Sequence, residues 1–156
     1  MLKERILGQL KTVQKYFDNS SGCLEEKDSE FAPAAGMFTA AQQVYHVAQT
    51  VDWFVEGVFG ARGFDLNFEQ HLAEMRKVKS LAAARKHLKE AFERAIKTVS
   101  AASEEELRAS LPPGPIMGGV PREAFVNGLA DHTAHHRGAL TVYSRLLGKV
   151  PDMPYA

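Results

Sequence analysis

The apolar residues of this chain recur every three or four positions, which is the repeat of amphipathic helices and not of strands. The first such pattern predicts a helix from about residue 2 to the low twenties; its apolar stripe is Leu2, Ile6, Leu10, Val13 and Phe17. After a loop, Thr39 and Gln42 have the spacing of a capping box, in which each side chain satisfies a free backbone donor at a helix start. A second helix is therefore expected to begin at Thr39 and to reach Gly60.

Residues 61–79 have weaker periodicity and are too many for a tight turn between antiparallel helices. They are expected to form a crossover, with a short helix around Phe68, Leu72 and Met75. Ser80 can cap a third helix, and its predicted apolar stripe is Leu81, Ala84, Leu88, Ala91, Phe92, Ala95 and Val99. Ser103 and Glu106 repeat the capping-box spacing and predict one short extra turn.

The prolines and glycines between residues 112 and 119 exclude regular helix, and Pro121 suits the first position of a new one. This fourth helix is expected to run from about residue 121 to Leu147 and to stop at Gly148. No alternating pattern is long enough to build a sheet. The sequence therefore predicts an all-α protein, a four-helix bundle in a single domain over residues 1–156, with a long crossover between helices two and three.

The composition narrows the possible partners. Lys plus Arg number 19 and Asp plus Glu number 19, so the chain has no net charge with which to bind nucleic acid or an anionic membrane. No apolar run approaches the roughly 18 residues that cross a bilayer, and the single cysteine, Cys23, cannot form an internal disulfide. A cytoplasmic protein without nucleic-acid or membrane partners is expected.

Helices one and two have more apolar positions than one stripe requires. These additional residues are Tyr16, Val44, Val51, Val55 and Phe59. A homodimer through helix faces is therefore expected.

Two histidines interrupt the apolar stripe of the fourth predicted helix. His132 and His136 occupy positions between Leu129 and Leu140 where the stripe calls for apolar residues. Their i, i+4 spacing places both imidazoles on one face about one turn apart, so that both rings can reach one ion. His135 is turned about 100 degrees away, toward Asp131, and is expected at the edge or on the surface.

Two ligands from one helix do not hold a metal tightly, and His46 in the second helix is the candidate third ligand. Its position borders the apolar side, so the sequence permits an inward orientation without requiring it. Three neutral imidazoles with an open fourth position are typical of a catalytic site, because structural zinc sites are normally closed by four protein ligands. The alternative is that these are hydrogen-bonded core histidines. His71 and His87 are expected to be solvated.

Other familiar motifs are missing. No histidine follows a glutamate by three residues, which disfavours a ferritin-like di-iron bundle. The segment from His132 to His136 has the histidine spacing of metalloproteases without the glutamate that serves as their general base. No glycine-rich phosphate loop is present, so nucleotide cofactors have no visible binding motif.

Three segments together resemble the DinB family. They are Ala34-Ala35-Gly36-Met37-Phe38-Thr39 leading to His46, Asp131-His132-Thr133-Ala134-His135-His136-Arg137-Gly138-Ala139-Leu140, and the ending Tyr143-Ser144-Arg145-Leu146-Leu147-Gly148-Lys149-Val150-Pro151. The resemblance covers nearly the whole chain. It implies helices in up-down-down-up order and one metal ion, zinc or nickel, held by His46, His132 and His136.

The resemblance also implies an activity. Relatives include metal-dependent hydrolases and transferases that use low-molecular-weight thiols, so the expected enzyme activates water or a thiol against a small electrophilic molecule. Asp131, Asp52, Glu56 and Tyr45 are candidates to orient the ligands, and the sequence does not choose among them. Arg137 is expected either to pair with a carboxylate or to be solvated. The alternative function is a non-catalytic, dimeric stress or ligand-binding bundle with a structural metal.

Overall fold

The computed structural model describes residues 1–156 as helices joined by loops, which confirms the all-α prediction. The four long helices are α1 (Leu2–Ser21), α2 (Ala40–Phe59), α4 (Leu81–Ala101) and α6 (Phe125–Leu146). The shorter elements are α3 (Phe68–Met75), α5 (Glu104–Arg108) and two 3₁₀ turns, η1 (Glu26–Asp28) and η2 (Arg122–Ala124). No helix is long and apolar enough to span a bilayer.

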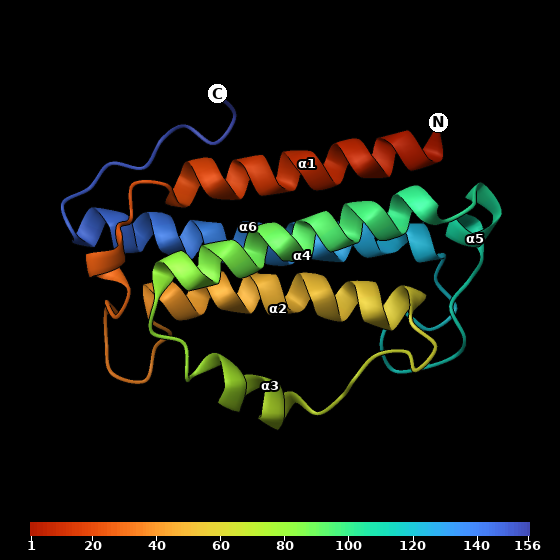
Figure 1. The fold of residues 1–156 in the computed structure, drawn as a ribbon, viewed down its shortest axis with the longest axis horizontal. Helices are drawn as coiled ribbons and strands as arrows, with labels where there is room; N and C mark the ends of the chain where they lie inside the picture. Colours follow the sequence, from red (N-terminus) through yellow and green to blue (C-terminus); the bar gives the residue numbers. More distant parts are fainter.

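The four long helices lie side by side along the long axis of the molecule (Figure 1). In that view α1 and α6 run from right to left, whereas α2 and α4 run from left to right. Because α2 and α4 point the same way, the chain between them returns along the whole bundle, and α3 lies within this connection. The most extensive packing is between α2 and α4, and α2 also packs against α6.

Capping residues set most of the helix starts. Thr39 Oγ1 accepts a hydrogen bond from the backbone N–H of Gln42 at 3.2 Å, and the Gln42 side chain accepts one from the N–H of Thr39 at 3.0 Å. This is the predicted capping box. Ser80 and Ser103 cap α4 and α5 in the same way through their hydroxyl groups. The start of the last helix differs from the prediction, because Pro121 precedes the 3₁₀ turn η2 and the α-helix begins only at Phe125.

The predicted stripes form the core, and so do the additional apolar residues of α2. Val44, Val51 and Val55 are buried inside the single chain, since α2 packs against both α4 and α6 and needs apolar residues on two sides. Phe59 packs edge-on against Phe125, with ring centroids 5.6 Å apart. These residues therefore do not form an exposed face on which a second copy of the chain could dock. The homodimer remains a prediction that these residues do not support.

Candidate metal centre

Three imidazole rings from two neighbouring helices meet in the bundle. His46 comes from α2, and His132 and His136 come from successive turns of α6. The Nε2 atom of His132 lies 3.2 Å from Nε2 of His46 and 3.2 Å from Nε2 of His136. One ring nitrogen of each residue lies within 4.8 Å of the others. The structure thus brings together the three histidines that the sequence singled out.

The two 3.2 Å distances from His132 Nε2 match those of a shared ion. Zinc binds imidazole nitrogen at about 2.0–2.1 Å in tetrahedral geometry, which separates two ligand nitrogens by about 3.3 Å. Three Nε2 atoms cannot all satisfy one another by hydrogen bonds, since a neutral imidazole carries only one N–H. The residues present therefore fit a divalent metal ion.

Burial keeps the three rings neutral. Desolvation is the largest cause and lowers the pKa of His136 to about 3 and that of His132 to about 4, and neighbouring histidines add to the effect. Burial also lowers the pKa of His46. The rings are therefore uncharged at neutral pH and keep the lone pairs that metal coordination requires.

A buried glutamine fixes the orientation of His136. Oε1 of Gln43 accepts the Nδ1–H of His136 at 2.5 Å, which leaves the lone pair on the Nε2 that faces His132. The Gln43 amide nitrogen donates to the Tyr143 hydroxyl at 3.2 Å, and that hydroxyl donates to the carbonyl of Phe38 at 2.8 Å. The amide of Gln43 is thus oriented from both ends.

A second glutamine, Gln49, lies one turn from His46 on α2. Its Nε2 donates a hydrogen bond to the backbone carbonyl of His71 at 3.1 Å. Sequence reasoning missed both glutamines. The signal was the spacing, because Gln43 and Gln49 lie three residues before and three after His46 and so share its face of α2.

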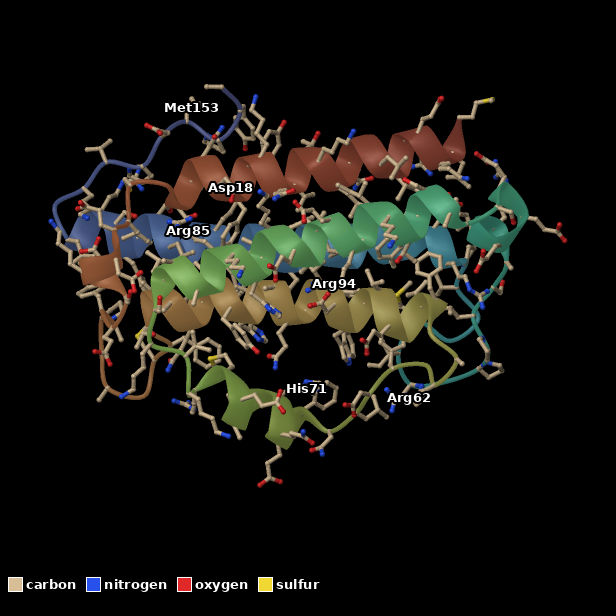
Figure 2. All side chains as sticks on the ribbon, viewed as in Figure 1. Asp18, Arg62, His71, Arg85, Arg94 and Met153 are labelled. Atoms are coloured by element: carbon tan, nitrogen blue, oxygen red, sulfur yellow. The ribbon has the colours of Figure 1, made fainter.

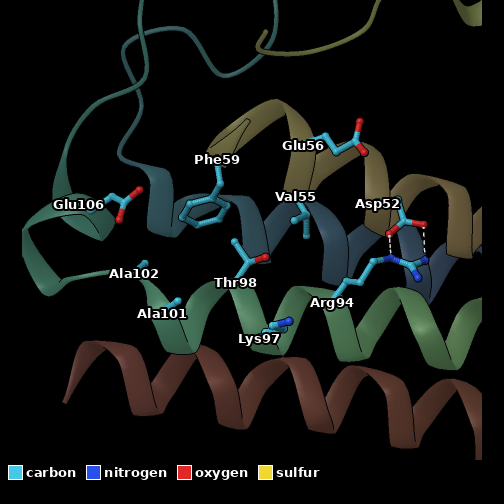
Figure 3. Close-up of a pocket in the computed structure, with 10 residues that line it drawn as sticks. All are labelled: Asp52, Val55, Glu56, Phe59, Arg94, Lys97, Thr98, Ala101, Ala102 and Glu106. Atoms are coloured by element: carbon cyan, nitrogen blue, oxygen red, sulfur yellow. Dashed lines mark hydrogen bonds and ion pairs between the residues drawn. The ribbon is translucent and has the colours of Figure 1, made fainter. Parts of the chain in front are cut away.

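The four residues proposed from the sequence to orient the ligands lie elsewhere. Asp52 forms a two-pronged ion pair with Arg94 of α4, at 2.8 Å for each bond, in a groove between α2 and α4 that Glu56 also lines (Figure 3). Tyr45 stacks on His87 at 5.0 Å between centroids, and Asp131 is exposed.

Two residues beside the histidines on α6 lie outside the cluster. His135 is exposed, as expected, and its ring packs edge-on against that of His136 with the centroids 4.8 Å apart. The guanidinium of Arg137 lies 6.0 Å from the ring centre of Tyr16, so it has an aromatic partner in place of a carboxylate.

A cavity of about 260 Å³ opens beside two of the three histidines. Its wall consists of residues from three helices, which are His46, Gln49, Thr50, Trp53 and Phe54 of α2, Phe68 and His71 of α3, and His132 of α6. His71 lies on the side of α3 that faces α2 (Figure 2). The space beside His46 and His132 is therefore open to a small molecule.

The expectation that His71 and His87 are solvated was wrong. The side chain of His71 is 26% exposed, with Nε2 3.2 Å from a carboxylate oxygen of Asp65. The side chain of His87 is 34% exposed, because it lies between Tyr45 and Asp52. Helix periodicity could not foresee either position, since both depend on how α2 packs against its neighbours.

Comparison with known proteins agrees with this architecture. The family model described as the DinB superfamily matches residues 9–140, and the chain belongs to that superfamily. A similar solved structure is YfiT from Bacillus subtilis, described as a probable metal-dependent hydrolase with an unusual four-helix bundle topology. The two are 16% identical with a TM-score of 0.68, over 94% of this chain and 88% of that one. No curated protein matches the sequence.

Proposed function

We propose that this protein binds one divalent metal ion, zinc or nickel, through His46, His132 and His136. We further propose that it is a metal-dependent hydrolase, or a transferase for a small thiol, that acts on a small electrophilic molecule. The observation that carries the proposal is the convergence of three Nε2 atoms, with 3.2 Å contacts, next to an open cavity. The description of YfiT as a probable metal-dependent hydrolase supports the same class of activity.

A divalent ion bound in such a site would act as a Lewis acid. It would lower the pKa of a bound water or thiol, so that more of that group is deprotonated at neutral pH. The protein itself orients one of the ligand histidines. Gln43 holds His136 by a hydrogen bond, so this ring enters the site already positioned. Thr50 adds a hydroxyl group 3.4 Å from Nε2 of His132 at the border of the cavity.

His71 is the residue that we assign to proton transfer. It lies on the cavity wall, and its Nε2 is 3.2 Å from the Asp65 carboxylate. This Nε2 is buried and makes no hydrogen bond to the carboxylate, and we assign proton exchange with the substrate to the imidazole ring as a whole. The Gln49 amide fixes the backbone of the same residue through its carbonyl.

The non-catalytic alternative calls for a metal enclosed by packing. The cavity beside His46 and His132 favours an active site instead, because a fourth ligand has room to enter from that side.

Elemental analysis of the purified protein tests the metal site, with His132→Ala as the comparison. About one divalent ion per chain in the wild type and none in the variant supports the site. The loaded protein is then assayed for ester and amide hydrolysis and for transfer of small thiols to electrophiles. A wild-type protein that binds no divalent metal when titrated would overturn the proposal, and a loaded protein inactive in both assays would leave only the non-catalytic alternative.

A further inference from the structure

The cavity beside the histidines has an aromatic wall. The Trp53 ring lies 5.2 Å from the ring of Phe54 and 6.1 Å from that of Phe68, centroid to centroid, and all three residues line the cavity. Aromatic pairs at these separations are in the favourable range for edge-on and tilted packing. Three aromatic side chains therefore border the cavity.

Surrounding contacts hold this wall in place. The indole N–H of Trp53 donates to the backbone carbonyl of Asp65 at 2.7 Å. The ring of Phe54 packs against Gly128 of α6 so closely that a Cβ there would lie 2.9 Å from Phe54 Cζ. A preformed aromatic wall lowers the entropic cost of binding a flat ligand.

The wall has no charged side chain. None of the residues lining it is a lysine, arginine, aspartate or glutamate. The Gln49 amide bonds the His71 carbonyl and the Thr50 hydroxyl faces Nε2 of His132, while Nε2 of His71 and Nδ1 of His132 make no hydrogen bond. An anion placed against this wall would lose its hydration without gaining a cationic partner, which is costly, and the negative faces of the aromatic rings would repel it.

Size restricts the ligand further. The volume of about 260 Å³ lies below the range of about 300–1,000 Å³ that is typical of drug-sized ligands. One substituted ring fits such a volume, whereas a nucleotide or a peptide does not.

We propose that the cavity selects a compact molecule with an aromatic body that carries no negative charge, whose polar reacting group points to His46 and His132. The proposal rests on the proposed function, since it names the substrate class for the same site. Trp53 and Phe68 are then the residues that determine specificity.

The single tryptophan of the chain reports binding directly, because Trp53 lies in the wall. The experiment titrates metal-free protein with benzyl alcohol and with benzoate, following Trp53 fluorescence. These probes share a ring and differ in charge, and leaving the metal out prevents benzoate from binding through an ion. Benzyl alcohol is expected to give a saturable change, with binding at least about tenfold tighter than that of benzoate.

Phe68→Ala tests the location of the binding site. Phe68 is 55% exposed, so its removal leaves the core intact, and it is expected to weaken benzyl alcohol binding about tenfold. Leu72→Ala is the matched control, since Leu72 lies one turn further along α3, is 42% exposed and does not line the cavity. This control is expected to bind as the wild type does.

Several results would overturn the inference: no saturable signal with benzyl alcohol, benzoate that binds equally well, or no effect of Phe68→Ala. Metal titration of the same samples separates this inference from the proposed function. Metal uptake without benzyl alcohol binding refutes only the substrate class. Benzyl alcohol binding without metal uptake refutes the proposed function and leaves an aromatic-binding cavity.

Discussion

Gln43 Oε1 and His136 Nδ1 lie 2.5 Å apart, a short hydrogen bond between two buried side chains on different helices. It joins α2 to α6 at the level of the three-histidine cluster and determines which nitrogen of His136 faces the other rings. The cluster is thus oriented by a neutral amide and not by the carboxylates or the tyrosine suggested from the sequence.

Replacing Gln43 should weaken metal binding while all three ligands remain. Gln43→Leu removes the acceptor for Nδ1–H, and loss of such a partner costs about 10–100-fold in metal affinity. Gln43→Glu keeps an acceptor and should retain most of the affinity. Competition with a chelating indicator measures these constants, with the exposed Gln70→Ala as control. Equal affinity for Gln43→Leu and the wild type would refute the orienting role.

The neighbouring histidines of α6 should behave differently. His132→Ala and His136→Ala are expected to abolish stoichiometric metal and His46→Ala to weaken it severely, because two protein ligands remain in each variant. His135→Ala should keep the ion, since its side chain is exposed and outside the cluster. The metal content of each purified variant is the deciding measurement. The melting temperature should rise with the fraction of protein that holds the ion. Retention of metal by His136→Ala together with loss by His135→Ala would require a different site.

The metal-free protein should lose stability in mild acid. The pKa values of His132 and His136 in the folded chain are about 4 and about 3, against about 6.5 in the unfolded chain. Between pH 6.5 and 4 the unfolded chain therefore binds more protons, so its free energy falls relative to the folded state as the pH drops. The expected loss is on the order of 1 kcal/mol per pH unit for each of these histidines.

Thermal melts of the metal-free protein across this pH window measure the effect. His136→Gln should show a shallower pH dependence, because one buried titrating group is gone, while His135→Ala should follow the wild type. Melting temperatures that do not change between pH 6.5 and 4 would contradict the buried, neutral state of the cluster.

Two glycine substitutions should have opposite effects on stability. In Gly57→Ala the new Cβ would lie 2.2 Å from a ring atom of Phe64, and the displaced ring should cost about 1–3 kcal/mol. In Gly138→Ala, within α6, the new Cβ meets nothing within 4 Å, so a gain of about 0.5–1 kcal/mol is expected from helix propensity. Urea unfolding compares the two variants. A stabilising Gly57→Ala would mean that Phe64 does not pack on this glycine.

Local rules accounted for much of the fold. The stripes of α1 and α4 and the Thr39 capping box follow from helix periodicity and from the bonding needs of free backbone N–H groups, so they could be predicted. The phase of α6 also put His132 and His136 together. The start of α6 was misplaced because proline fits a 3₁₀ turn as readily as the first turn of an α-helix.

The surroundings of the histidines were harder to predict. The partners of Gln43 are Tyr143 and His136, which lie about a hundred residues further along the chain and meet it only when α2 packs on α6. Glutamine is also a good helix former that usually faces solvent, so its burial carries no local signal. His71 was assigned to solvent as a residue of the crossover, whereas the structure places it against α2.

The crossover between α2 and α4 contributes side chains to the cavity but little to the hydrophobic core. The helices that hold the three histidines also form the hydrophobic core, so a change there disturbs folding. By contrast, α3 buries only Met75, yet it supplies Phe68 and His71 to the cavity. Substitutions on the exposed surface of α3 can therefore change the lining of the cavity while the helices that hold the three histidines keep their packing.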